Sequence, residues 1–301
     1  MSASKRSTKC IDHHPAVGHV AATMLRQRLD TVWTELRAVC VMSGDADHVH
    51  ALRVATRRAL AAIDAFRSVI PAKRRTWFEK RLRRLRRAAG EARDLAMLIE
   101  RLRTSRAVGP RRRLVAMLSR RHRLSQEPIC AQRTKLKKAD WSFRVDRLIE
   151  AVHGRRRRTG FRAFARRRFK PMVASFIDTA DRSTRDNHDI HELRIEGKKL
   201  RYAMEIFAGV FPAGIRGRCQ KSLERLQDSL GECTDHAAAA DRLYHWSRSA
   251  TAGPDRDMLV ALSDEENKKA NRARKAFCKW WNPARRRSLT QNLDRALRDS
   301  A

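Results

Sequence analysis

Apolar residues recur along the chain at spacings of three and four, and runs of β-branched residues are absent. This spacing places apolar side chains on one stripe of an α-helix and polar side chains on the other. Only 12 glycines and 8 prolines interrupt the pattern, which further favours helices. The chain is therefore predicted to be all-α. The predicted helices span residues 20–39, 49–69, 74–89, 111–123, 143–153, 161–180, 190–210, 216–230 and 257–277.

Residues that end or begin helices occur twice in the same order. Proline cannot continue a helix, glycine suits a left-handed C-terminal cap, and aspartate is a common N-cap. We therefore expect one helix to stop at a proline, the next to stop at a glycine, and a fourth helix to begin at an aspartate. The residues are Pro71, Gly90 and Asp94 in the first set and Pro212, Gly231 and Asp235 in the second. Pro128 and the Gly109–Pro110 pair mark loops.

A nine-residue segment occurs twice, 141 residues apart. His-Ala-Leu-Arg-Val-Ala-Thr-Arg-Arg at 50–58 reappears as His-Glu-Leu-Arg-Ile-Glu-Gly-Lys-Lys at 191–199. We call these the motif segments. The same offset pairs identical residues without a gap at Phe66 and Phe207, Pro71 and Pro212, Lys80 and Lys221, Gly90 and Gly231, and Asp94 and Asp235. One register over so many identities indicates a duplicated helical unit.

The duplication predicts the organisation of the whole chain. Residues 1–15 are expected to form a flexible N-terminal tail, residues 16–157 the first repeat and residues 158–301 the second. Each repeat should form a bundle of about four helices, and the two bundles should pack around a pseudo-two-fold axis.

Each motif segment divides into two faces when it is drawn as a helix. Arg53 and Arg57 share the stripe of His50, because residues three and four apart lie on one side of a helix. The second copy places Arg194 and Lys198 beside His191 in the same way, with Arg201 nearby. The opposite faces are apolar and should pack into the bundles: Leu52, Ala59, Ile63, Phe66 and Ile70, then Leu193, Leu200, Met204, Phe207 and Phe211.

A second cationic feature is also duplicated. Lys80 and Arg84 form an i, i+4 pair of like charges, and Lys221 and Arg225 repeat it. Such a pair destabilises a helix by a few tenths of a kcal/mol. A bound polyanion would explain why both copies contain it.

The overall charge points to the same kind of partner. The chain has 68 Lys and Arg against 33 Asp and Glu, a formal net charge of +35, which opposes compaction and favours anionic ligands. No apolar stretch approaches membrane-spanning length, and residues 1–10 lack the apolar core of a secretory signal. We expect a soluble cytoplasmic protein that does not bind membranes. Its cysteines form no C-x-x-C pair and should be reduced thiols: Cys10, Cys40, Cys130, Cys219, Cys233 and Cys278.

The repeated segments resemble the CHAD domain, the conserved-histidine α-helical domain. The resemblance rests on residues 50–58 with the helix to Phe66, on residues 191–202, and on Leu-Gln-Asp-Ser-Leu-Gly-Glu-Cys-Thr-Asp at 226–235. It implies two four-helix bundles with a basic pore or groove that binds inorganic polyphosphate. The implied binding residues are His50, Arg53, Arg57, Arg58, His191, Arg194, Lys198 and Lys199, with Lys80, Arg84, Lys221 and Arg225 as weaker candidates and Arg201 used on one side only. The Glu-x-Glu-x-Lys signature of the triphosphate-tunnel domain often fused to this family is absent, so we do not transfer that domain's activity.

Several functions compete with polyphosphate binding. A single-stranded nucleic-acid binder usually stacks bases on aromatic side chains, but aromatics make up only 6% of the chain and the motif faces contain only Tyr202. Nonspecific DNA or RNA binding is the main alternative. An enzyme is less favoured, because no P-loop or other catalytic motif is present. No cofactor is implied. A metal site would need a consistent ligand set, and the two copies differ here: Asp45, Asp47, His48 and His50 against His188, Asp189 and His191. We expect a polyphosphate-binding protein that associates with polyphosphate granules.

Overall fold

The computed structural model describes residues 16–42, 45–103, 110–155, 160–182, 187–250 and 253–298. Within these ranges the regular structure is entirely helical and contains no strand, which confirms the all-α prediction. The helices are α1 (Val17–Val41), α2 (Ala46–Ala65), α3 (Ala72–Arg103), α4 (Pro110–Leu124), α5 (Glu127–Lys138), α6 (Trp141–His153), α7 (Phe161–Asp181), α8 (Asn187–Ile206), the 3-10 turn η1 (Ala208–Val210), α9 (Ala213–Ser249), α10 (Pro254–Trp280) and α11 (Pro283–Arg298).

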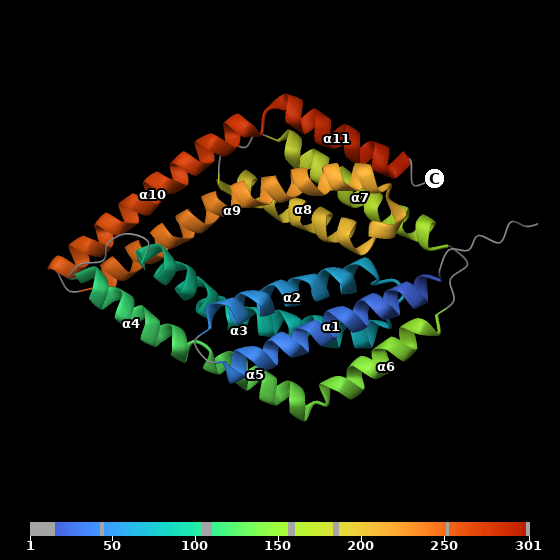
Figure 1. Ribbon diagram of the computed structural model, residues 1–301, viewed down its shortest axis with the longest axis horizontal. Helices are drawn as coiled ribbons and strands as arrows, with labels where there is room; N and C mark the ends of the chain where they lie inside the picture. Colours follow the sequence, from blue (N-terminus) through green and yellow to red (C-terminus); the bar gives the residue numbers. More distant parts are fainter. Residues whose placement is uncertain are drawn as a thin grey trace, which may run out of the picture.

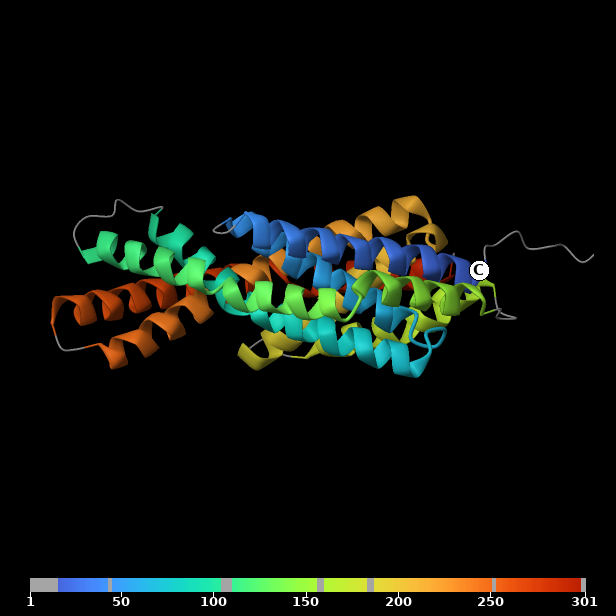
Figure 2. The ribbon, with the colours of Figure 1, turned by 90° about the horizontal axis from the view of Figure 1, so that it is seen from below.

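The helices gather into two lobes that share an extended arm (Figure 1). Helices α1, α2, α3, α5 and α6 form the first lobe, and α7, α8, α9 and α11 form the second. Helices α2 and α8, which contain the motif segments, contact each other between the lobes. At one end of the molecule, the C-terminal parts of α3 and α9 continue beyond the lobes and pack with α4 and α10 (Figure 2).

The apolar faces of the motif segments hold the lobes together. The predicted apolar residues of both copies are buried, and they belong to one hydrophobic core that spans both lobes. Phe66, at the end of α2, lies 6.0 Å from the ring of Phe164 and 6.0 Å from that of Phe207. Burying a phenylalanine stabilises a fold by about 1.5–3 kcal/mol, so these contacts fix the position of one motif helix relative to the other. A smaller core fills the arm.

The predicted ends of two helices are wrong. Helix α3 passes through Gly90, and α9 passes through Gly231, so neither glycine is a C-cap. Asp94 and Asp235 consequently lie inside helices and are not N-caps. A methyl group on Gly90 would stand 3.7 Å from an Arg53 nitrogen, and the equivalent group on Gly231 would stand 3.8 Å from Arg194. The glycines therefore lie beneath the motif arginines, and that contact is what the two copies share.

Other differences concern the number and ends of helices. Helices α5 and α11 were not predicted, so each predicted repeat contains more than about four helices. Pro128 lies in the first turn of α5, where its missing N–H removes no hydrogen bond. Helix α2 ends at Ala65 and α8 at Ile206, about a turn before the predicted ends. The predicted tail at 1–15 and the boundary at 157/158 lie outside the described residues.

The cysteines also depart from the prediction. Cys40, near the end of α1, forms a disulfide with Cys130 of α5, so these two residues are not reduced thiols. Their Cα atoms lie 5.6 Å apart across 90 residues of sequence, within the usual range for a disulfide. Only the packing of α5 on α1 brings them together, and their sequence spacing gives no sign of it. Cys219 and Cys233 are free and buried, Cys278 is exposed, and Cys10 lies outside the described residues.

No helix in the described ranges combines the length and apolar character needed to cross a bilayer.

Candidate functional site

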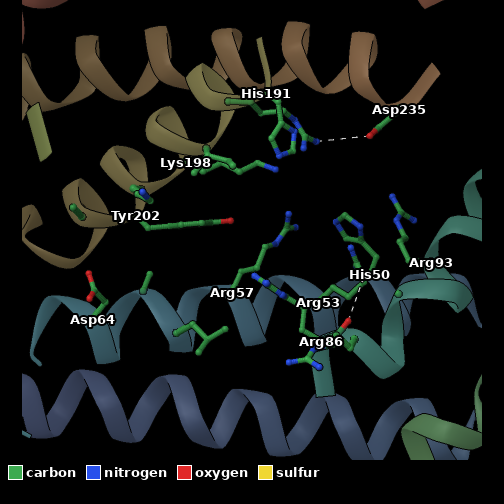
Figure 3. Close-up of a pocket in the computed structure, with 18 of the residues that line it drawn as sticks. His50, Arg53, Arg57, Asp64, Arg86, Arg93, His191, Lys198, Tyr202 and Asp235 are labelled. Atoms are coloured by element: carbon green, nitrogen blue, oxygen red, sulfur yellow. Dashed lines mark hydrogen bonds and ion pairs between the residues drawn. The ribbon is translucent and has the colours of Figure 1, made fainter. Parts of the chain in front are cut away.

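A cavity of about 970 Å³ lies between the two motif helices. Helices α2, α3 and α8 line most of it, with contributions from α7 and α9. Figure 3 shows His50, Arg53 and Arg57 pointing into this space from α2 and His191 and Lys198 pointing toward them from α8. The two copies of the motif therefore converge on one space, although they are 141 residues apart in sequence.

The cavity is strongly basic. Eight lysines and arginines and two histidines line it, against three aspartates. The cations are Arg53, Arg57, Arg86, Arg87, Arg93, Arg194, Lys198 and Lys199, the histidines are His50 and His191, and the acids are Asp64, Asp94 and Asp235. Like charges at this density repel one another in a partly desolvated space, so the cavity attracts anions.

Each aspartate of the cavity is engaged by an arginine. Asp94 accepts a hydrogen bond of 2.9 Å from Arg242, Arg168 lies 3.5 Å from Asp64, and Arg194 lies 3.7 Å from Asp235. Most of the remaining cations have no such partner. Within the described ranges, no carboxylate lies within 4.0 Å of the following charged groups: Arg53, Arg57, Arg86, Arg87, Arg93 and Lys198. No acid of the described chain neutralises these six side chains, so their charge can attract a ligand.

The two motif arginines are positioned by the helices beneath them. Arg53 donates to the carbonyl oxygens of Arg86 and Ala89 on α3, both at 3.4 Å. Arg194 instead pairs with Asp235 on α9. Burial lowers the pKa of both guanidinium groups from the ordinary arginine value, while Asp94 and Asp235 act in the opposite direction. A bound anion would relieve this unfavourable burial of charge.

Lys198 and His50 show how strongly the site disfavours further positive charge. Burial, followed by the charges of Arg194 and Arg57, lowers the pKa of Lys198 from 10.5 to about 7. Burial, followed by Arg93 and Arg57, also lowers the pKa of His50. Both groups therefore lose protons more readily than they would in water, and an anion nearby would reverse the effect.

Comparison with known proteins identifies the family. The CHAD domain profile matches residues 23–244, most of the chain. This chain belongs to the CHAD domain family. A crystal structure of the CHAD domain from the plant Ricinus communis superposes with a TM-score of 0.66 at 19% identity, covering 96% of this chain and 95% of that one. The structure of PptA from Streptomyces chartreusis gives a TM-score of 0.61 at 18% identity, covering 89% of this chain and 99% of that one. Both likenesses show the shared helical fold. No curated protein sequence matches this chain.

Seven of the predicted binding residues line the cavity of this CHAD domain, and six lie outside it. Arg58 turns toward Glu205 at 3.3 Å, and Arg201 lies over the ring of Tyr202 at 5.1 Å. Arg225 lies over the ring of Trp280 at 5.2 Å. The remaining three side chains are exposed to solvent and belong to Lys80, Arg84 and Lys221. The cavity follows α3 only from Arg86 to Met97 and α9 only at Asp235, so the earlier turns of both helices do not reach it. A binding role for these six residues stays a prediction.

Three arginines of the cavity were not predicted. Arg86, Arg87 and Arg93 come from α3 of the CHAD domain, and their counterparts in the second repeat are Gln227, Asp228 and Thr234. The sequence prediction selected cations that occur in both copies of the repeat, and these three arginines do not meet that condition. Extending the α3 stripe by three and four residues, from Arg86 through Gly90 to Arg93, would have found two of them.

The residues weighed as a metal site do not gather together. Asp45 caps α2 by accepting a hydrogen bond from the Asp47 amide at 2.8 Å. His48 lies 3.8 Å from Asp45 and 3.8 Å from Glu35, whereas His50 faces the cavity. No group of three potential metal ligands occurs in the part of the chain that the structure describes.

Proposed function

We propose that this CHAD domain binds inorganic polyphosphate in the cavity between α2 and α8, as a binding protein and not as an enzyme. The observation that carries the proposal is the set of six cations in the cavity that have no carboxylate partner. Had the protein's own acids neutralised them, little affinity for an anion would remain.

The chemistry of the cavity suits a chain of phosphates. Arginine presents a fork of N–H donors to two phosphate oxygens, and lysine adds a mobile point charge. Arginines from α2 and α3 face Lys198 of α8, and Arg194 of α8 lines the same cavity, so a linear polyanion there is contacted from several sides. Its bound counterions are released on binding, and the affinity should fall steeply as salt concentration rises.

The composition of the cavity favours polyphosphate over nucleic acid. Proteins that bind single strands stack bases on aromatic rings. Tyr202 is the only aromatic side chain of that kind lining the described cavity; it is buried, and Arg201 already covers its ring. Attachment to cytoplasmic polyphosphate granules is the cellular role we propose.

Removing cavity cations tests the proposal. The double variant Arg57→Ala/Lys198→Ala should bind long-chain polyphosphate roughly 10²- to 10⁴-fold more weakly at physiological salt, since each lost charged hydrogen bond contributes about 1.5–3 kcal/mol. Lys137→Ala/Lys138→Ala removes the same charge from the exposed surface of α5 and serves as the matched control. Isothermal titration calorimetry measures both affinities.

Nonspecific binding through net charge predicts a different result. Both double variants would then lose affinity equally, and mixed-sequence DNA would compete as well as polyphosphate at equal phosphate concentration. Either outcome would refute specific binding in the cavity. Steady release of orthophosphate from polyphosphate in the presence of Mg²⁺ would refute the assignment as a binding protein without catalysis.

A further inference from the structure

Lys198 differs from the other lysines that the structure describes in the surroundings of its amine. Its amine points into the cavity (Figure 3), where Arg57 faces it from α2 and Arg194 and Arg201 flank it on α8. Asp235 of α9 is the one acid that acts on it, and that carboxylate is paired with Arg194. The amine is thus partly buried, surrounded by cations and free of a carboxylate contact.

An amine in this position is a nucleophile. The pKa of Lys198 is about 7, so a large share of the amine is neutral at pH 7.5, against about 0.1% for a lysine of ordinary pKa. A neutral amine has a free lone pair, and lysines desolvated beside other cations are a known way of producing such a group.

We infer that Lys198 is a site of non-enzymatic acylation by acyl phosphates, small anions in which an acyl group is joined to phosphate. The inference rests on the anion binding proposed for this cavity. Arg57 and Arg194 line the same cavity as Lys198. Their charge would hold the phosphate group of the reagent and bring its carbonyl carbon to the Lys198 amine.

The reaction balances without a further reagent. The Lys198 nitrogen attacks the acyl carbon and forms a C–N bond, and the C–O bond to phosphate breaks. The phosphate leaves with that bonding electron pair, and the nitrogen releases one proton to water. The products are an amide on Lys198 and inorganic phosphate, whose charge the same arginines stabilise as it leaves.

Acylation would also regulate the proposed function. The amide is neutral at every pH and cannot take up the proton that a bound phosphate would favour on the amine, so the modified cavity loses one of the six groups that can pair with phosphate. Polyphosphate in the cavity would in turn exclude the acyl phosphate. Modification and polyphosphate binding should therefore oppose each other.

Lys199 provides an internal control. It is the next residue on α8 and also borders the cavity, but its amine lies 2.5 Å from the Glu196 carboxylate. Cleavage after Glu196 and Glu205 releases both lysines in one nine-residue peptide, Gly-Lys-Lys-Leu-Arg-Tyr-Ala-Met-Glu. Tandem mass spectrometry of this peptide compares the two sites directly.

The experiment incubates the full chain with acetyl phosphate at pH 7.5 and follows acetylation of this peptide over time. We expect Lys198 to react on the order of tenfold faster than Lys199. Burial, lower basicity and the charge of the bound reagent, which raises the pKa of the amine, each offset part of the gain in neutral amine. The uncharged reagent N-hydroxysuccinimidyl acetate should show a smaller preference, since the arginines do not recruit it. Equal rates at the two lysines, or equal preference with both reagents, would overturn the inference.

A second arm separates this inference from the proposed function. Long-chain polyphosphate should protect Lys198 from acetyl phosphate, and inorganic phosphate should protect it at higher concentration. Selective acetylation that inorganic phosphate blocks and polyphosphate does not would support the modification site and refute polyphosphate binding in the cavity. These comparisons use the unaltered chain, so no variant has to fold.

Discussion

At the scale of single residues, the cavity retains charge that the fold alone would not favour. Lys198, Arg53 and Arg194 are partly removed from water, and burial lowers the pKa of each. Of these three residues, only Arg194 has a carboxylate partner within the described part of the chain. Each group therefore opposes folding in the absence of a ligand, as expected where binding and stability make conflicting demands.

This conflict predicts the effect of removing Lys198. Lys198→Met should stabilise the unliganded protein at pH 6.5 by about 1–2 kcal/mol, a figure reduced for the partial exposure of the amine. The folded pKa of about 7 lies below the ordinary value of 10.5, so between these values the unfolded chain holds more protons. Wild-type stability therefore rises with pH across this window, and the advantage of the variant disappears by about pH 10.5.

Urea denaturation of both proteins at pH 6.5, 8.5 and 10.5 measures this difference. A variant that is less stable than wild type at pH 6.5 would show that Lys198 carries no penalty.

At the scale of helices, the two longest elements are continuous where glycine suggested an end. Helices α3 and α9 both run past the cavity and into the arm. Because they do not stop at Gly90 and Gly231, Arg93, Asp94 and Asp235 are carried to the cavity. A break at either glycine would separate these side chains from the motif segments.

Substituting the two glycines tests this continuity. Gly90→Ala and Gly231→Ala should each raise the free energy of unfolding by about 0.5–1 kcal/mol, because alanine favours a helix interior and the added methyl groups meet arginine nitrogens only at 3.7 and 3.8 Å. A left-handed capping glycine would respond in the opposite way. Gly253, whose φ is 140°, is the control: Gly253→Ala should lower stability. Thermal and urea denaturation report all three.

At the scale of the whole molecule, part of the excess positive charge lies where the lobes meet. The chain carries a formal net charge of +35, and the cavity collects cations from α2, α3 and α8. A polyanion bound there contacts both lobes at once. It should therefore relieve self-repulsion and favour the folded form over the unfolded one.

Thermal denaturation should show that bound polyphosphate and added salt each stabilise the folded protein. At a ligand concentration of about 100 times Kd, polyphosphate should add about 2.7 kcal/mol, which raises Tm by roughly 5 °C for a chain of this size. The increment should shrink as salt rises, while added salt alone raises the Tm of the free protein by screening repulsion. Orthophosphate at the same phosphate concentration is the control. An unchanged Tm at saturating polyphosphate would argue against a preformed site.

Local patterns in the sequence were sufficient for part of this account. Helical periodicity predicted the all-α fold, and the faces of the motif segments predicted which apolar residues are buried, because both depend on the spacing of residues within one helix. The same spacing predicted that His50, Arg53 and Arg57 share one face of a helix, and that His191, Arg194 and Lys198 do so in the second copy.

The tertiary structure alone decided which cations share the cavity. Arg86, Arg87 and Arg93 join it although they have no matching partners in the second repeat, while Arg58 turns to Glu205 and Arg225 lies on Trp280. The Cys40–Cys130 disulfide was likewise decided by the packing of α5 on α1. Such contacts depend on distances between helices that are far apart in sequence, and periodicity within a single helix carries no information about them.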